Sequence, residues 1–133
     1  MRELFSSVQR KMLYSQIKEL KFFDSLINDG NLIKFLSAIW DIDALPSTDM
    51  RFNTMRADIQ QHMINNNDWE YDYLFSEILN IYKDDEIFIK FVQETVMPCY
   101  HNRESQLVIV NTINEYLLPK QFILNLIALM KMV

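Results

Sequence analysis

The chain contains one glycine and three prolines among its 133 residues. Folds built from antiparallel strands turn sharply many times, and glycine and proline are the usual residues of those turns. Half of the residues are hydrophobic, which is far from the composition of disordered chains and suits a packed core. This length is also that of one domain. We therefore predict an all-α fold in which residues 1–133 form a single helical domain, a compact array of about six or seven short helices.

Apolar residues recur at three- and four-residue steps along most of the chain, the pattern of amphipathic helices. In the first helix this pattern predicts that Val8 and Met12 lie on the buried face. Residues 119–133 fit a short helix, although their β-branched and aromatic residues are also compatible with a strand. The other predicted helices span residues 3–29 with a break near Ser15, 32–40, 54–66, 69–82, 86–97 and 104–118.

Residues that begin or end helices lie between these segments. Glycine is the usual residue of a left-handed helix end, and proline withholds a backbone donor. Short polar side chains cap helix N-termini by accepting backbone N–H groups. We predict that Gly30 and Pro98 end helices, that Asn31, Asp68 and either Asp84 or Asp85 cap the next ones, and that residues 41–53 form an ordered loop.

The net charge of −5 is unevenly distributed. Residues 1–34 carry six basic and four acidic side chains, whereas residues 41–86 carry three and eleven. A protein that grips phosphates normally clusters lysine and arginine, so we expect no nucleic-acid partner. The basic residues near the N-terminus fit the solvated face of a helix better than a binding patch; they are Arg2, Arg10, Lys11, Lys18 and Lys21.

The only cysteine, Cys99, excludes an intrachain disulfide. The N-terminus interrupts its apolar residues with charges and lacks the apolar core of a signal peptide. No apolar run is long enough to cross a bilayer. We therefore expect a cytoplasmic protein with no membrane association.

Asp58 and His62 are four residues apart on a predicted helix, and Asn65 extends the same stripe. One interpretation is a carboxylate that orients an imidazole for acid–base chemistry or for the outer shell of a metal. The other, which we favour because no nucleophile lies at a meaningful spacing, is a hydrogen-bonded pair that fixes packing near Trp69. In the following aromatic run we assign Trp69, Tyr73 and Leu74 to the core, because acidic neighbours do not suit base stacking.

Arg56 and His62 are six residues apart in "RADIQQH". This spacing resembles the motif of HEPN-type ribonucleases, helical enzymes in which the pair handles the scissile phosphate. Those enzymes usually carry a polar residue directly after the arginine, and Ala57 stands here. A small metal-independent ribonuclease that uses Arg56 and His62 is therefore the minority hypothesis.

Neither a metal nor a cofactor is expected. A structural zinc site needs four ligands with paired spacings, and Cys99 with His101 supplies one pair. The acidic loop "DIDALPSTD" lacks the glycine and the final glutamate of a calcium loop. One glycine also excludes dinucleotide-binding and P-loop patterns.

Four segments, "LPSTDMRF", "DIQQHMINNNDW", "FIKFVQETVMP" and "INEYL", occur in this order. Together they resemble the third type of N-terminal domain on AbiJ-like abortive-infection proteins, a helical module fused to effector domains in bacterial antiphage systems. The resemblance covers roughly residues 30–118, and its most specific parts are Pro-Ser-Thr-Asp, Asp-x-x-x-His and Asn-Asp-Trp. The matching positions are Pro46, Ser47, Asp49, Arg51, Asp58, His62, Asn67, Asp68 and Trp69.

The resemblance implies an accessory role: such a domain senses, docks or regulates while a separate effector carries out the chemistry. Members of the family tend to continue into a glycine-containing hairpin and an effector, and this chain has neither. The alternative that the 133 residues are the N-terminal module of a longer protein therefore stays open.

We accordingly expect a non-enzymatic sensing, docking or regulatory module of a bacterial antiphage system, with a protein partner or a fused effector. A second alternative, a purely structural helical scaffold, predicts that His62 is fully buried and bonded only to Asp58 or to backbone. The residues expected to form one polar site are Asp49, Arg51, Asp58, His62, Asn65, Asp68 and Trp69.

Overall fold

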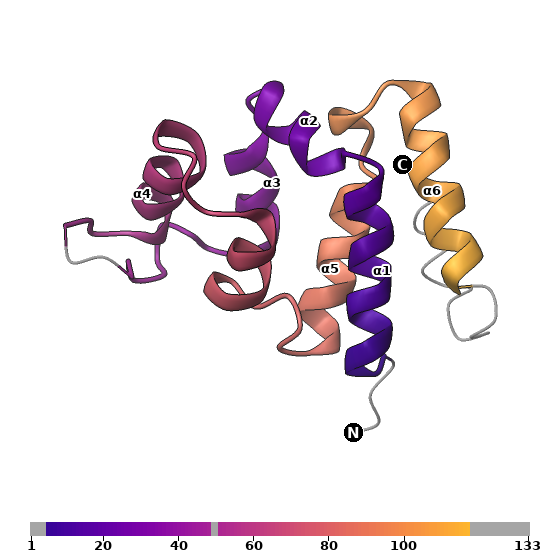
Figure 1. Cartoon of the computed structure of the whole chain (residues 1–133), viewed down its shortest axis with the longest axis horizontal. Helices are drawn as coiled ribbons and strands as arrows, with labels where there is room; N and C mark the ends of the chain where they lie inside the picture. The colour runs from indigo at the N-terminus through magenta and orange to yellow at the C-terminus, as the bar shows by residue number, and fades with distance from the viewer. Residues whose placement is uncertain (1–4, 49–50, 118–133) are drawn as a thin grey trace. The chain divides into compact units, whose positions relative to one another are not determined.

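The computed structural model describes residues 5–48 and 51–117 (Figure 1). Every regular element within these ranges is a helix, so the all-α prediction is confirmed. These ranges contain seven helices and one short 3-10 turn, if α4 and the π-helix that continues it are counted as one helix. In chain order the elements are α1 (Ser7–Glu19), α2 (Phe22–Asn28), α3 (Leu32–Ile39), α4 (Met55–Ile59), η1 (Gln60–Asn65), η2 (Tyr73–Ile78), α5 (Asp85–Thr95), η3 (Pro98–Tyr100) and α6 (Arg103–Leu117).

The chain divides into two compact units. Unit 1 combines the residues up to Phe22 with those from Tyr82 onward, and unit 2 is the intervening segment Phe23–Ile81. The polar residues predicted to form a site all belong to unit 2. That residues 1–133 form a single domain stays a prediction.

Unit 1 is built from α1, α5 and α6. The rings of Phe5 and Phe88 meet edge to face with centroids 5.3 Å apart. Helices α1 and α6 lie against each other, and the Tyr116 hydroxyl donates a 2.8 Å hydrogen bond to the Gln9 carbonyl oxygen. The buried hydrophobic side chains of this unit are Phe5, Leu13, Tyr14, Ile17, Phe22, Phe88, Phe91, Val92, Val96, Tyr100, Ile109 and Ile113.

The buried face of α1 differs from the predicted one. Val8 and Met12 are more than half exposed, whereas Leu13 and Ile17 are buried. Arg10 is buried on the same face: its guanidinium donates to the Tyr82 carbonyl oxygen at 2.6 Å and to the Asp85 carboxylate at 2.7 Å. Its assignment to a solvated basic face is therefore wrong: the side chain is buried, and partners 72 and 75 residues away bind its two terminal nitrogens.

The break in the first predicted helix lies at Leu20 and Lys21, not near Ser15. Lys21 adopts a left-handed conformation, with φ of 64°, and its N–H donates to the Lys18 carbonyl oxygen. Both features are typical of a helix C-terminus. The prediction missed the break because lysine, unlike glycine or asparagine, seldom occupies this conformation.

Local capping at α5 follows the sequence closely. The Asp84 side chain accepts a 2.9 Å hydrogen bond from the Ile87 N–H, which confirms Asp84 as the cap. Asp85 and Glu86 occupy the first turn, where the helix dipole favours negative charge. The helix ends at Thr95, and Pro98 opens the short turn η3.

Burial in unit 1 raises the pKa of Tyr100 above its ordinary value of 10.0, and the hydrogen bond from its hydroxyl to the Glu94 carboxylate raises it further. The unfolded chain therefore loses this proton first as the pH rises. The stabilisation is fully present below about pH 10 and is lost above it. We expect the urea midpoint to fall as the pH rises from about 10 to about 11, and to fall less in Tyr100→Phe. Equal falls in wild type and variant would contradict this expectation.

Unit 2 contains the remainder of α2 with α3, α4, η1 and η2. Phe23 on α2 packs against Phe75 on η2, with ring centroids 4.8 Å apart. Backbone N–H groups at the start of α4 bind the preceding loop: Met55 donates to Leu45 and Arg56 to Ile42, both at 3.0 Å. The buried hydrophobic side chains of this unit are Phe23, Leu26, Leu32, Phe35, Leu36, Ile39, Ile42, Met55, Ile59, Met63, Leu74, Phe75, Leu79 and Ile81.

Gly30 ends α2 in the left-handed conformation that was predicted, with φ of 72°. Asn31 occupies the cap position before α3, but its side chain makes no capping hydrogen bond. A Cβ atom at position 30 would meet no atom within 4 Å, so only the backbone conformation requires glycine there.

Gly30→Ala is expected to lower the free energy of unfolding by about 1 kcal/mol, because alanine resists positive φ and no new contact compensates. Gly30→Asn should cost less, since asparagine tolerates this conformation. Urea denaturation of both variants measures the difference. A fully stable alanine variant would show that the turn adopts another conformation.

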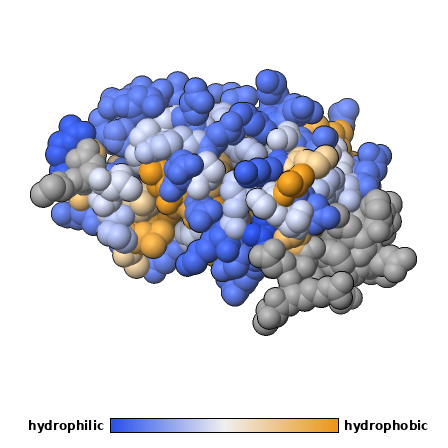
Figure 2. Space-filling model, turned by 60° about the horizontal axis from the view of Figure 1, so that its bottom comes forward, coloured by the Kyte–Doolittle hydropathy of each residue, from blue (hydrophilic) through white to orange (hydrophobic). Residues whose placement is uncertain are grey.

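Hydrophilic residues dominate the face drawn in Figure 2, with smaller hydrophobic patches between them. Exposed hydrophobic residues are common on protein surfaces, and single ones need no explanation. The large ones that are at least 46% exposed among the described residues are Val8, Met12, Ile64, Tyr73, Leu107 and Val108.

Candidate functional site

His62 and Trp69 form a stacked pair in unit 2. The two ring planes are 11° apart and their centroids 4.3 Å apart. The imidazole Nδ1 lies 2.8 Å from a carboxylate oxygen of Asp68, and the His62 side chain is 15% exposed. Because Nδ1 faces a carboxylate it carries a hydrogen, which leaves Nε2 as the acceptor of the neutral ring. The imidazole is thus fixed in orientation at the edge of the core.

A tight turn after η1 brings these three residues together. The His62 carbonyl oxygen accepts from the N–H groups of Asp68 at 2.8 Å and Trp69 at 3.2 Å. Asn67, between them and η1, adopts φ of 51°, a conformation that asparagine tolerates well. The prediction that Asp68 caps a helix from Trp69 is therefore wrong: the next helix begins at Tyr71, and the Asp68 carboxylate binds His62 instead.

Asp58 serves a different part of unit 2. Its side chain is fully buried, and its two carboxylate oxygens accept three hydrogen bonds from the preceding loop. The donors are the Ser47 hydroxyl at 2.6 Å, the Thr48 N–H at 2.6 Å and the Thr48 hydroxyl at 2.9 Å. Asp58 thus anchors this loop to the start of the helix formed by α4 and η1.

The predicted pairing of Asp58 with His62 is wrong in either interpretation. Each residue is bound to a different partner. Asp58 accepts from residues 47 and 48, which precede it in the chain, and His62 is bonded to Asp68, which follows it. The scaffold alternative predicted a fully buried His62 that is bonded only to Asp58 or to backbone. His62 is instead 15% exposed, and its imidazole is bonded to the Asp68 side chain. The helix becomes π-helical from Gln60, which changes the angle between the two side chains.

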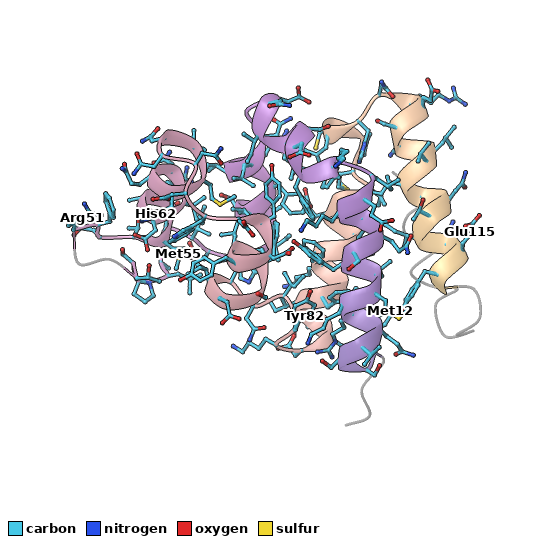
Figure 3. All side chains as sticks on the ribbon, viewed as in Figure 1. Met12, Arg51, Met55, His62, Tyr82 and Glu115 are labelled. Atoms are coloured by element: carbon cyan, nitrogen blue, oxygen red, sulfur yellow. The ribbon has the colours of Figure 1, made fainter. Side chains whose placement is uncertain are left out.

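The other predicted site residues contribute less defined contacts. Asn65 is exposed, and its amide reaches only the Gln61 side chain, at 3.5 Å. Arg51 is exposed on the loop, with its guanidinium carbon 5.5 Å from the centroid of the neighbouring Phe52 ring (Figure 3). Asp49 lies outside the described residues.

Arg56, the first residue of the minority ribonuclease hypothesis, pairs with Asp43. Its Nε and one terminal nitrogen donate to the two carboxylate oxygens at 2.7 and 3.1 Å. These bonds lower the pKa of Asp43 and raise that of Arg56. Neither Arg56 nor His62 is bonded to the other, so the two are engaged separately.

Tyr73 is a surface residue that the sequence analysis placed in the core. Leu74 is buried as predicted, whereas Tyr73 is 46% exposed and Trp69 is half-buried. The Tyr73 ring meets the Trp69 ring edge to face, with centroids 5.6 Å apart. The alternation of acidic and aromatic residues in "DWEYDY" could have indicated a surface position.

Among the described residues, no group of three or more His, Cys, Asp and Glu side chains is placed to hold a metal ion. Cys99 is exposed. None of the helices in residues 5–48 and 51–117 has both the length and the apolar character needed to span a membrane.

A family model described as AbiJ N-terminal domain 3 matches residues 5–130. The match covers nearly the whole chain and extends well beyond the roughly 30–118 of the predicted resemblance. No curated protein and no solved structure shows a significant match to the chain.

Proposed function

This chain belongs to the family described as AbiJ N-terminal domain 3, and from that premise we propose that it is a non-enzymatic sensing, docking or regulatory module. A domain of this type indicates an abortive-infection, antiphage context. Its partner in this proposal is another protein or a fused effector domain. The family gives the antiphage context, and we propose in addition the role of the module and the surface that performs this role.

The observation that carries the proposal is the fixed, partly exposed stack of His62 on Trp69. The Asp68 bond and the ring stack hold the imidazole in one orientation before any partner arrives. Preorganised aromatic surfaces lose little entropy on binding and recur at the centres of protein interfaces. The surface is therefore suited to docking.

The charged side chains that could serve catalysis are bound to other parts of unit 2, which supports the same proposal. Asp58 is buried and accepts three hydrogen bonds from the loop, and Arg56 is paired with Asp43. Ribonuclease chemistry through Arg56 and His62 would require both groups to turn toward one phosphate. Each would have to leave a carboxylate to do so.

The test is phage plating on cells that carry the native locus. We expect His62→Ala and Trp69→Ala to abolish protection while the purified variants keep their helical circular dichroism. Gln60→Ala, an exposed residue on the same π-helix, is the matched control and should protect like wild type. Full protection by folded His62→Ala and Trp69→Ala variants would overturn the docking role and favour a structural scaffold.

A second experiment separates docking from catalysis. Purified chain is incubated with labelled RNA beside His62→Ala and Arg56→Ala variants. We expect no cleavage by any of the three. Cleavage by wild type that both substitutions abolish would overturn the non-enzymatic assignment and support the ribonuclease.

A further inference from the structure

Next to the stack of His62 on Trp69, unit 2 presents an exposed aromatic ring, Tyr73, with exposed acidic side chains close to it in the sequence. The sequence from residue 57 to residue 82 contains no lysine or arginine, and four of its five acidic side chains are exposed. The fifth, Asp58, is buried with its loop partners. Negative charge on this surface is therefore not offset by a basic residue of the same segment.

The exposed ring at the centre of this surface is Tyr73. Trp69 lies against it edge to face, and the pair leaves nearly half of Tyr73 open to solvent. Glu77 is exposed on the π-helix η2 that begins at Tyr73, and Glu70 and Asp72 are exposed just before it. We call this surface the acidic aromatic face; its residues are Asp68, Trp69, Glu70, Asp72, Tyr73 and Glu77.

We propose that the acidic aromatic face docks a basic protein segment, one in which arginine or lysine side chains project from an extended or helical backbone. A guanidinium or ammonium group is attracted to the face of a tyrosine or tryptophan ring, and arginine also stacks on it. Surrounding carboxylates add attraction over several ångströms and accelerate encounter. The inference rests on the proposed docking function and names the chemistry of its partner.

The charge of the whole unit supports a cationic occupant over an anionic one. Residues 23–81 carry three basic and ten acidic side chains, and the rest of the chain carries ten and eight. Of the three basic residues of unit 2, Arg56 is paired with Asp43. A nucleic acid would be repelled from such a unit, so the face fits a protein partner.

The test measures the anisotropy of a fluorescent synthetic peptide in which arginine alternates with serine, titrated with the full chain. We expect saturable binding that weakens several-fold as salt rises from about 0.05 M to about 0.5 M. Tyr73→Ala should weaken binding about two- to fivefold, and Tyr73→Phe, which keeps the ring, should bind like wild type. Combined Glu70→Gln, Asp72→Asn and Glu77→Gln substitutions should weaken it more than about tenfold.

The controls separate a docking face from general charge attraction. Asp29→Asn removes an exposed carboxylate elsewhere in unit 2 and should leave the affinity unchanged. Loss of affinity in Asp29→Asn equal to that in Tyr73→Ala, or no loss in the triple variant, would overturn the proposal. Competition by spermine as strong as by the peptide would also overturn it, because the occupant would then be a small cation. Circular dichroism verifies that each variant is folded.

The two proposals fail in different experiments. Suppose that the face variants lose peptide binding while His62→Ala and Trp69→Ala still protect against phage. The face would then still bind a basic segment, but docking through it would have no role in defence. Suppose instead that Trp69→Ala loses protection but the wild-type chain does not bind the basic peptide. The docking role would then stand, and its partner would not be a basic segment.

Discussion

Arg10→Met is expected to lower the free energy of unfolding by about 3 to 5 kcal/mol. The substitution keeps most of the side-chain volume but removes both hydrogen bonds of the guanidinium, to the Tyr82 carbonyl and to the Asp85 carboxylate. The Asp85 carboxylate, which is 20% exposed in the wild-type chain, would lose the guanidinium as a partner. A partly buried carboxylate that loses its guanidinium partner costs more than a surface ion pair contributes, which is why the effect is large. Urea denaturation followed by circular dichroism measures it.

Two further variants show whether the ion pair causes the effect. Lys11→Met removes an exposed charge from the next position of α1 and should change stability by less than about 0.5 kcal/mol. The double variant Arg10→Met with Asp85→Leu should recover part of the loss, because it also removes the partly buried carboxylate that the guanidinium bound. If the Arg10 and Lys11 variants unfold at the same urea concentration, the buried pair does not stabilise unit 1.

The second large effect is expected for Asp58→Ala, with a loss of about 3 kcal/mol or more. Alanine removes the buried carboxylate that accepts from the Ser47 hydroxyl, the Thr48 N–H and the Thr48 hydroxyl. Hydrogen bonds to a charged acceptor are among the strongest in proteins, and three converge here. The loop before α4 should also become sensitive to protease, which limited proteolysis detects.

Asp43→Ala is the matched control for this substitution. Asp43 belongs to the same loop and also binds α4, but its pair with Arg56 is exposed, so the stability should change far less. Thr48→Val removes one donor of the Asp58 cluster and should produce a smaller loss than Asp58→Ala. Equal stability of the Asp58 and Asp43 variants would show that the buried carboxylate does not hold the loop.

Most of the helices could be predicted from the sequence because their determinants are local. Apolar residues at helical spacing identified α3 and α5, and Gly30 and Asp84 marked a helix end and a helix start through contacts within a few residues. The helix end at Lys21 was not predicted, because lysine does not usually adopt the positive φ that the chain has there.

The two π-helices were also not predicted. Such helices are rare, so periodicity alone favours an α-helix. Both end in the same way: the N–H groups of Asn66 and Leu79 bond to the fifth residue before them, and Asn67 and Asn80 follow in the left-handed conformation. The asparagine after each segment was visible in the sequence, but it is equally typical of an ordinary helix end.

The family motifs acquire a physical explanation from the contacts of Asp58 and His62. The Pro-Ser-Thr-Asp segment supplies the hydroxyl and N–H groups that bind Asp58, and Asn-Asp-Trp supplies the carboxylate and ring that bind His62. Neither partner lies at a helical spacing from the residue that it binds. The sequence therefore indicated which residues matter without indicating how they pair.

The sequence by itself determined the all-α class, most helix boundaries and the acidic character of unit 2, since these depend on composition, period and neighbours in the chain. Only the tertiary structure decided the partners of Arg10, Asp58 and His62 and the exposure of Tyr73. The physical reason is that a polar side chain takes the partner that packing brings within about 3 Å. Helical spacing is compatible with several partners for each side chain, and the path of the turns between helices determines which partner comes close.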